Sequence, residues 1–493
     1  MSLAEAIARS LRDGGGAEAV EHAHGVASWR DLAEAAAAVD GALSLAGLGP
    51  GAIIGLPGRN RLAPAAAFLG LLGSSRCAAM INPFQPLDRV AADAETAKAR
   101  AVILEEEDLA LGELSGDFGV YVWAGGALRQ HRAPAPNGAA SETLPALVMA
   151  TSGTTGAPKR IEIAARTLDR ALREIIGFNQ GFGDLDRPGP ELPALIQYSP
   201  LAHIAGALTL SRAAAQQRTV ALLEKFEPHV WADIVRRRRP RTTGLPPAMM
   251  KMALEAALPA GDLESLVSVW SGSAPVDPKV ETVFSQRYGL PVLGNYGATE
   301  FCGAVATWSL EDHARLALEK SGAVGRILPA VAEARVRSQD GEELLAPGEI
   351  GALELKVHRV GDAWLVTIDL AHLDADGFLY LHGRADDAIN RGGFKIAPAA
   401  VAEALMSHPG VAEALVVGLD DPRLGQVPVA VVVPRKGAPP VNERELIAHV
   451  KQRLPAYCAP TAVKFVEAAP RTPAMKIDRR AVRALFRESS EAD

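Results

Sequence analysis

The segment from residue 151 to residue 159 concentrates groups that bind phosphate. Its two glycines allow backbone N–H groups to turn toward one point, its four hydroxyls add donors, and its lysine adds a positive charge. An apolar run at residues 146–150, typical of a buried strand, comes directly before it. This composition suits a polyphosphate better than it suits a polar surface turn. The predicted phosphate ligands are Thr151, Ser152, Gly153, Thr154, Thr155, Gly156 and Lys159.

The spacing within this loop differs from that of a Walker A loop. A Walker A loop has four residues between its two glycines and a Ser or Thr directly after its lysine. Here only two residues separate Gly153 from Gly156, and Arg160 follows Lys159. Residues 161–163 then alternate as in a strand, whereas a Walker loop leads straight into a helix. We therefore expect a hairpin-like loop between two strands.

Composition and charge exclude several other classes. The 493 residues include 58 acidic and 51 basic ones, and this acidic excess disfavours nucleic acid as a partner. Cys77, Cys302 and Cys458 are odd in number and far apart, so we expect no disulfide framework and a cytoplasmic location. The most apolar segment, residues 62–73, is too short to span a membrane. Five arginines between Arg236 and Arg241 are interpreted as a solvated helix end rather than an anion patch.

The elements that must position this loop alternate between strand and helix. Strands are expected at residues 52–56, 76–82 and 101–104, and helices at 63–72 and 90–97. The same alternation returns after Tyr198, with helices at 228–238 and 247–258 and strands near Thr242 and at 265–270. Such alternation predicts two α/β subdomains with doubly wound, mostly parallel sheets.

The remaining third of the chain has a different pattern. Short strands separated by turn residues between Val324 and Tyr380 predict a small antiparallel β-barrel or sheet. Beyond Gly383 we expect a small α+β domain, with helices at 398–406 and 443–454 and strands at 414–418 and 427–433. Asn442 stands three residues before Glu445, a pairing typical of a helix N-terminus. The predicted fold class is therefore α/β, with a large N-terminal domain and a small C-terminal one.

Several short motifs follow the phosphate loop in an order that occurs in a known family. They lie at residues 199–203, 272–275, 295–300, 383–387, 391–396 and 470–479, with Asp369 between the third and the fourth. Each motif alone is a weak signal, but the ordered set is specific and covers nearly the whole chain. The sequence resembles the adenylate-forming, or AMP-binding, superfamily, which includes acyl-CoA synthetases, aryl-CoA ligases, luciferases and peptide-synthetase adenylation domains.

The resemblance implies that the chain activates a carboxylate with ATP. It assigns Glu300 to Mg²⁺, Thr299 to the α-phosphate, and Lys476 to the substrate carboxylate and the α-phosphate together, with Thr151 as the fourth catalytic residue. Two residues stand where the family usually has glycine: Ile368, directly before Asp369, and Met475, directly before Lys476. The residues that the resemblance assigns to adenine and ribose are Gly272, Ser273, Ala274, Asn295, Tyr296, Gly297, Asp369 and Arg384.

The resemblance also implies a second step, in which coenzyme A accepts the acyl group. A C-terminal cap, residues 384–493, is expected to turn on a hinge at Asp386 against a body formed by residues 1–383. Gly392 and Gly393 would then line the channel for the pantetheine arm. The residues that line the acyl pocket are expected to be mostly small and apolar, which favours an aromatic or medium-chain aliphatic acid. Its predicted lining is His203, Gly206, Trp270, Gly294 and Cys302.

Residue types leave some alternatives open. Cys302 is interpreted as a buried apolar side chain rather than a nucleophile, and His203 has a structural interpretation as well as one in the pocket. The chain could also be a homologue that binds nucleotide without catalysis, or an adenylating enzyme that loads a carrier-protein thiol. The sequence leaves a homodimer open.

Overall fold

The computed structural model describes residues 1–109, 112–134, 145–151, 159–178, 189, 191–274, 276, 278–338, 341, 343–384, 389–391, 394–472 and 477–487. The chain forms two compact units. The first unit consists of Met1–Glu319 with Leu328–Val331 and Val357–Asp362, and the second of Lys320–Ile327, Ala332–Lys356 and the chain from Ala363 onward. The domain boundary expected after residue 383 stays a prediction.

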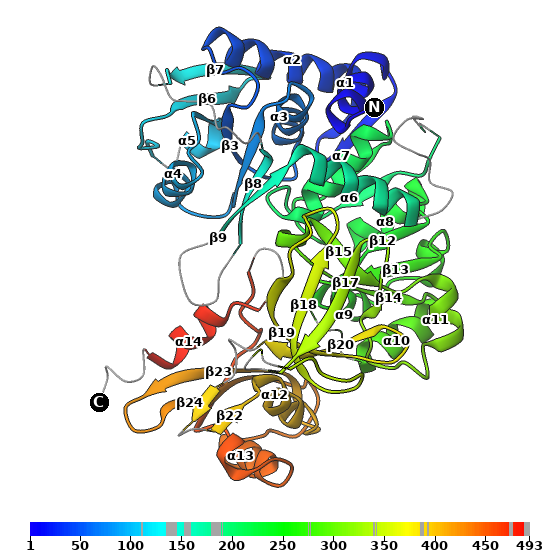
Figure 1. The fold of residues 1–493 in the computed structure, drawn as a ribbon, viewed down its shortest axis with the longest axis vertical. Helices are drawn as coiled ribbons and strands as arrows, with labels where there is room; N and C mark the ends of the chain where they lie inside the picture. The colour runs from blue at the N-terminus through cyan, green and yellow to red at the C-terminus, as the bar shows by residue number, and fades with distance from the viewer. Residues whose placement is uncertain are drawn as a thin grey trace. The chain divides into compact units, whose positions relative to one another are not determined.

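A seven-stranded sheet forms one half of the first unit (Figure 1). Its four inner pairings are parallel, and the two outer strands run antiparallel to their neighbours. The parallel centre and the intervening helices confirm the doubly wound arrangement expected for this region. In sheet order the strands are β7 (Ala127–Arg132), β6 (Gly119–Ala124), β5 (Ala101–Glu105), β3 (Ile53–Pro57), β4 (Cys77–Ile81), β8 (Pro145–Thr151) and β9 (Lys159–Ala164).

Both faces of this sheet are covered, and the strand residues alternate between two cores. Ile54 belongs to the core with α1 (Leu3–Asp13), α2 (Trp29–Leu45) and α3 (Leu62–Gly73), whereas Ile53 belongs to the core with α4 (Leu87–Thr96). Helix α3 is apolar on every side because it is buried between the sheet and the other helices. A short helix, α5 (Glu106–Leu109), follows β5. None of the described helices is both long and apolar enough to cross a membrane.

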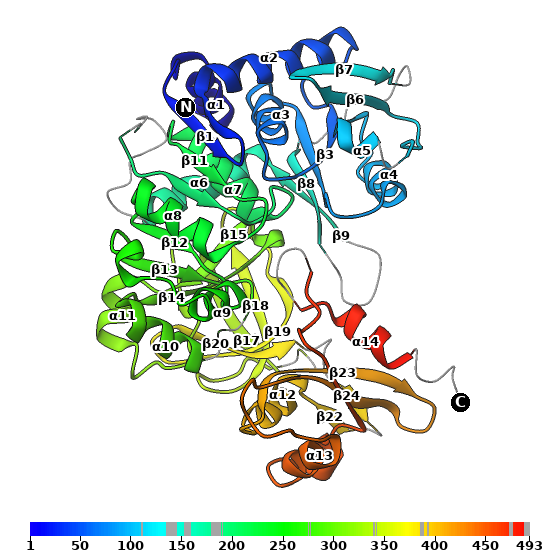
Figure 2. The same cartoon turned by 180° about the vertical axis from the view of Figure 1, so that it is seen from behind.

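The other half of the first unit contains two groups of strands (Figure 2). The N-terminal hairpin of β1 (Glu18–His22) and β2 (Gly25–Ser28) joins β11 (Val220–Leu222) and β10 (Leu195–Gln197) in a four-stranded sheet. The second group begins with three parallel neighbours, β12 (Thr242–Gly244), β13 (Ser268–Ser271) and β14 (Val292–Ala298). Strand β15 (Gly303–Thr307) then pairs with β14 in the antiparallel direction. The helices here are α6 (Ala165–Phe178), α7 (Ile204–Ala215), α8 (Pro228–Arg238), α9 (Pro247–Glu255), α10 (Pro278–Tyr288) and α11 (Leu310–Leu316).

The arginine run ends helix α8, as the sequence predicts. Arg236–Arg238 form ion pairs with Asp233, Glu21 and Glu18, and Arg239 caps the helix in the left-handed conformation. These carboxylates neutralise the arginines, which agrees with the interpretation as a helix end and not as an anion patch.

The second unit contains antiparallel strands followed by a small α+β sheet. Its first strands lie in the order β16 (Gly325–Ile327), β20 (Phe378–Arg384), β19 (Leu365–Leu373), β18 (Gly351–Val357) and β17 (Ala332–Arg337). The predicted cap of α13 is confirmed, because the Asn442 side chain accepts from the Glu445 N–H at 3.0 Å. The remaining elements are β21 (Ile389–Arg391), β22 (Phe394–Ile396), β23 (Val411–Asp421), β24 (Gly425–Pro434), β25 (Ala462–Phe465), α12 (Pro398–Met406), α13 (Glu443–Lys451) and α14 (Arg479–Arg487).

Candidate active site

The predicted phosphate loop connects two antiparallel strands. Thr151 at the end of β8 lies opposite Lys159 at the start of β9, and helix α6 begins only at Ala165. This confirms a hairpin arrangement in place of a Walker loop. Lys159 has an exposed side chain. Residues 152–158, and with them the predicted ligands Ser152, Gly153, Thr154, Thr155 and Gly156, lie outside the described residues.

Thr299 and Glu300 lie in a tight turn at the carboxyl end of β14. Residues Thr299–Phe301 form a single 3₁₀ turn, η2, which the Cys302 N–H closes by donating to the Thr299 carbonyl at 3.0 Å. Cys302 is in the left-handed region with φ 55°, and Gly303 follows with φ 120°. Side chains at the carboxyl ends of parallel strands commonly form ligand sites in α/β proteins. The half-buried Glu300 carboxylate is therefore placed where a hard cation could be held.

Gly272 and Ser273 come directly after β13, beside β14. A Cβ on Gly272 would lie 2.2 Å from Asn295 Oδ1 and 3.1 Å from the Asn295 carbonyl oxygen, so a larger residue would require the Asn295 side chain to move. Ser273 has φ 68°, a backbone conformation that is uncommon outside glycine. Ala274 is described and exposed. The structure thus brings the predicted adenine residues from two segments together at one end of these parallel strands.

Tyr296 and Gly297 complete this group at the end of β14. The Tyr296 side chain is buried, and its ring centroid lies 6.4 Å from that of Phe301. A Cβ on Gly297 would lie 2.3 Å from the Gly303 carbonyl oxygen, because β14 and β15 approach closely after a bulge. Gly297 is therefore needed for the strand pairing that leads into the Thr299–Glu300 turn.

The predicted acyl-pocket residues Trp270, Gly294 and Cys302 come from β13, β14 and the turn before β15. Trp270 packs edge-to-face against Phe178 of α6, with ring centroids 5.8 Å apart. Phe178 was not found from the sequence, since it belongs to no motif and lies far from Trp270 along the chain. Burial raises the pKa of the Cys302 thiol to about 12, so this cysteine is a weak nucleophile at neutral pH.

His203 and Gly206 lie at the start of α7. The His203 imidazole is the N-cap of this helix, and its Nδ1 accepts from the Ala205 N–H at 3.3 Å. Gly206 has no room for a side chain, since a Cβ would lie 2.3 Å from the Pro200 carbonyl oxygen. The hydrogen bond to the Ala205 N–H thus supports the structural interpretation of His203.

The turn before His203 is held by a buried asparagine that sequence analysis did not single out. Asn60 Nδ2 donates to the Ser199 carbonyl at 3.0 Å and to the Leu223 carbonyl at 2.9 Å, and Asn60 Oδ1 accepts from Gln197 Nε2 at 2.9 Å. A buried amide with its hydrogen bonds satisfied specifies the local geometry. Asn60 therefore fixes the turn that leads into α7.

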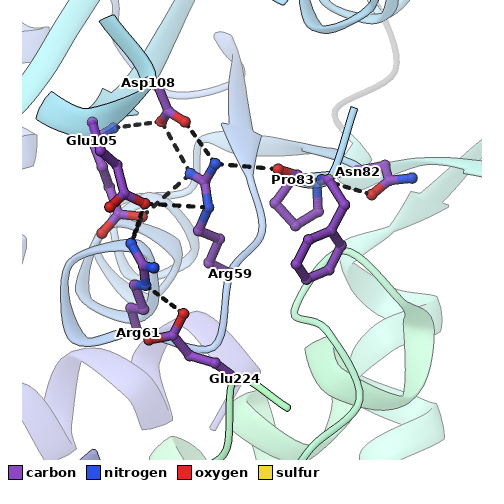
Figure 3. Close-up of polar contacts among 9 residues, drawn as sticks. Arg59, Arg61, Asn82, Pro83, Glu105, Asp108 and Glu224 are labelled. Carbon is purple, nitrogen blue, oxygen red and sulfur yellow. Dashed lines mark hydrogen bonds and ion pairs between the residues drawn. The ribbon is translucent and has the colours of Figure 1, made fainter. Parts of the chain in front are cut away.

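Arg59 and Arg61, on either side of Asn60, anchor the loop between β3 and α3 (Figure 3). Arg59 binds both oxygens of the Asp108 carboxylate, at 2.6 and 3.0 Å, and also donates to the Pro83 carbonyl at 3.2 Å. Arg61 pairs with Glu224 at 2.7 Å. Glu105 also lies within this network, and burial raises its pKa. Each of these acidic residues forms an ion pair with Arg59 or Arg61. The network therefore holds the loop after β3 in place.

Another buried arginine contacts the Thr299–Glu300 turn. Arg359 Nε donates to the Phe301 carbonyl at 2.6 Å, and Arg359 Nη2 donates to the Ala304 carbonyl at 2.8 Å. The same guanidinium pairs with Glu174 of α6. Neither Arg359 nor Glu174 stands in a motif, and no sequence signal marks them.

In the second unit, Asp369 of β19 lies directly opposite Arg384 of β20. These two predicted ribose residues are therefore brought together. Ile368, where the family usually has glycine, lies in a continuous strand with no positive φ, a conformation that isoleucine adopts readily. Lys476, Met475, Asp386, Gly392 and Gly393 lie outside the described residues.

Comparison with known proteins agrees with this arrangement. Residues 7–360 match the AMP-binding enzyme family, and residues 400–476 match the AMP-binding enzyme C-terminal domain. The sulfoacetate–CoA ligase of Cupriavidus necator is 32% identical over 447 residues, which cover 83% of each chain. The 2-succinylbenzoate–CoA ligase of Bacillus licheniformis is 33% identical over 351 residues, 68% of this chain and 69% of that protein.

A solved structure covers almost the full length. The amide bond synthetase McbA from Marinactinospora thermotolerans has a TM-score of 0.77 and 27% identity, over 98% of this chain and 99% of that one. The chain therefore belongs to the AMP-binding enzyme family of adenylate-forming enzymes, in its acyl- and aryl-CoA synthetase branch.

Proposed function

We propose that this chain adenylates an apolar carboxylic acid with ATP, releases pyrophosphate, and transfers the acyl group to coenzyme A. The observation that carries the proposal is the convergence of Gly272, Tyr296 and Glu300 at the carboxyl ends of β13 and β14. The reaction class, an AMP-forming acid–thiol ligase, is that of its curated relatives. Cytoplasmic location and a homodimer stay predictions.

The turn of Thr299 and Glu300 fits a Mg²⁺ ion bound together with ATP. Its carboxylate is a hard oxygen ligand, which Mg²⁺ prefers, and the turn holds it at a fixed place at the end of β14. Mg²⁺ there would neutralise charge on the phosphates. Thr299 would donate its hydroxyl to the α-phosphate, where negative charge develops as pyrophosphate leaves. The loop that includes Thr151 and Lys159 would hold the other phosphates.

We assign adenine to the segment of Gly272, Ser273 and Ala274. The missing side chain of Gly272 lets Asn295 pack directly against the backbone of this segment, and Tyr296 would supply an aromatic face from the neighbouring strand. The assignment of Asp369 and Arg384 to the ribose hydroxyls stays a prediction, supported by their placement opposite each other.

The side chains at the expected acyl site favour an apolar acid. Packed edge-to-face, Phe178 and Trp270 would form an aromatic wall of this site, and Gly294 and Cys302 would add little bulk and no charge. An aromatic ring or a medium-length alkyl chain would bury apolar area against this wall. By contrast, two relatives are named for acids with a second anionic group, sulfoacetate and 2-succinylbenzoate.

The test is pyrophosphate release measured with a panel of acids. Phenylacetate, benzoate, hexanoate and octanoate represent the apolar class, and sulfoacetate and 2-succinylbenzoate the anionic one. We expect release with at least one apolar acid, and a thioester of matching mass once coenzyme A is added. Preference for sulfoacetate or 2-succinylbenzoate would contradict the apolar pocket.

Two carboxylates supply a matched pair of variants. Glu300→Gln should lower pyrophosphate release and raise the Mg²⁺ concentration required. Glu311→Gln, on the exposed surface of α11, should leave both unchanged. If both variants released pyrophosphate at the same rate and required the same Mg²⁺ concentration, the assignment of Glu300 as a metal ligand would be wrong.

The two half-reactions separate the predicted roles of the C-terminal part. Lys476→Ala should abolish pyrophosphate release while preformed acyl-adenylate is still converted to thioester. Asp386→Pro should leave pyrophosphate release intact and block thioester formation, because a proline at a hinge restricts rotation. Loss of both half-reactions in either variant would argue against the assigned role.

Similarity to McbA favours a second candidate, in which an amine takes the acyl group from the adenylate to form an amide. The acceptor is decided by offering coenzyme A, a primary amine and a carrier-protein thiol separately to the enzyme with its best acid. ATP binding without pyrophosphate release from any acid would instead indicate the homologue without catalysis.

A further inference from the structure

We propose that Arg359 and Glu174 act as a positioning clamp for the turn that carries Thr299 and Glu300. The inference rests on the proposed function, because it takes Glu300 as the carboxylate that holds the metal bound with ATP. It adds two residues to the site that lie outside all the sequence motifs.

The geometry of Arg359 is that of a buried clamp. Its side chain is 2% exposed, and the Glu174 side chain with which it pairs is 17% exposed. The guanidinium donates to the carbonyls of Phe301 and Ala304, on the two sides of Cys302 and Gly303. One rigid, planar group therefore ties the turn at Phe301 to β15 at Ala304.

The turn is the end of the hairpin in which β14 pairs with β15. It spans four residues between β14 and β15, and one backbone hydrogen bond, from the Cys302 N–H to the Thr299 carbonyl, closes it. Cys302 occupies the left-handed region, which a residue with a side chain adopts only when its surroundings hold it there. The Arg359 hydrogen bonds on both sides of Cys302 are such surroundings.

Glu174 connects this turn to the phosphate hairpin. It lies in α6, which begins directly after β9, the strand that leaves the predicted phosphate loop. Its other carboxylate oxygen accepts from Arg170 Nε at 3.1 Å, and Arg170 Nη1 donates to the His358 carbonyl at 3.0 Å. Helix α6 thus holds residues 358 and 359 at two points. The clamp links the segment expected to bind phosphate with the segment expected to bind the metal.

The charge pattern explains why the pair is suited to positioning and not to direct metal binding. Glu174 has a guanidinium on each of its oxygens, so both are already occupied by cationic donors. Arg359 is likewise engaged by one carboxylate and two carbonyls. The effect on the metal must therefore pass through the backbone between residues 299 and 304.

The test measures Mn²⁺ binding, with Mn²⁺ as the probe for the metal. Electron paramagnetic resonance gives the Kd of Mn²⁺ in the presence of a non-hydrolysable ATP analogue for the full-length wild type, Arg359→Ala, Arg359→Lys and Glu174→Gln. Groups that orient a metal ligand typically change affinity by about 10- to 100-fold. We expect Arg359→Ala to weaken Mn²⁺ binding by about 10-fold or more, with partial recovery in Arg359→Lys.

A matched control separates positioning from general stability. Arg76 is also 2% exposed and donates to a carboxylate, Asp40, and to a backbone carbonyl, that of Leu48, but it lies directly before β4. Arg76→Ala should lower the unfolding midpoint as Arg359→Ala does and leave the Mn²⁺ Kd unchanged. In steady state, Arg359→Ala should reduce kcat for pyrophosphate release more than it changes KM for the acid.

Two results would overturn the clamp. One is a wild-type Mn²⁺ Kd in folded Arg359→Ala and Glu174→Gln; the other is an equal loss of affinity in Arg76→Ala. The proposed function fails separately, if the wild type binds Mn²⁺ with the ATP analogue but releases no pyrophosphate with any acid. In that case the binding comparison still decides the clamp.

Discussion

Replacing Gly297 by alanine should damage both stability and the first half-reaction. The added Cβ would lie 2.3 Å from the Gly303 carbonyl oxygen and 2.7 Å from the Ala304 Cα. Both are backbone atoms, so no side chain can rotate away to relieve the contact. The two strands must separate by about 0.7 Å before the carbonyl contact reaches 3.0 Å.

The expected loss of stability follows from overpacking, and the expected loss of rate follows from how close Gly297 lies to the predicted catalytic residues. Forcing a methyl group into a packed region costs about 1–3 kcal/mol of unfolding free energy. Since the separation occurs two residues before Thr299, the turn moves with it, and a displacement near 1 Å in a catalytic site can cost about 100-fold in rate. We expect both effects in Gly297→Ala.

The assay combines urea unfolding with pyrophosphate release under saturating ATP and acid. Gly41→Ala is the matched control, because a Cβ on this exposed glycine of α2 meets no atom within 4 Å. It should raise stability by up to about 1 kcal/mol and leave the rate unchanged. If Gly297→Ala matched the wild type in both measurements, the close approach of β14 and β15 would be refuted.

Three further predictions test other parts of the structure. Burial raises the pKa of Cys77 and Cys302 to about 12, so at pH 8 neither should react with a disulfide reagent within minutes, and fast labelling of either residue in the native chain would contradict its burial. Burial also raises the pKa of Glu105, so the folded state binds its proton more tightly and the unfolding free energy falls as pH rises from the ordinary glutamate pKa through the raised value. This fall should be absent in Glu105→Gln when both are unfolded with urea across pH 4–8. Asn442→Ala should lower stability by about 0.5–2 kcal/mol through loss of the α13 cap, while Asn442→Asp should retain most of it.

Local patterns in the sequence were enough to predict several of the helices and strands. Helix α8 and helix α12 have the bounds predicted from their patterns, and the cap at Asn442 formed as expected. These features depend on neighbours within a few residues, since periodicity and capping are local properties. The phosphate hairpin was likewise predictable, because alternation after Lys159 excluded a helix there.

Pairings between distant segments could not be predicted in this way. The N-terminal strand β1 pairs with β11, about 200 residues further along the chain, and nothing local to either strand indicates its partner. The same holds for the contact of Phe178 with Trp270, two residues that lie far apart along the chain.

The sequence by itself determined the family, the reaction class and the order of the motifs that the resemblance assigns to ATP. Only the tertiary structure decided what holds those motifs in place. Arg359 is 58 residues from Phe301 and 185 residues from Glu174 along the chain. An arginine acquires a positioning role through the carbonyls and carboxylates that folding places around it, and a linear pattern carries no record of such contacts.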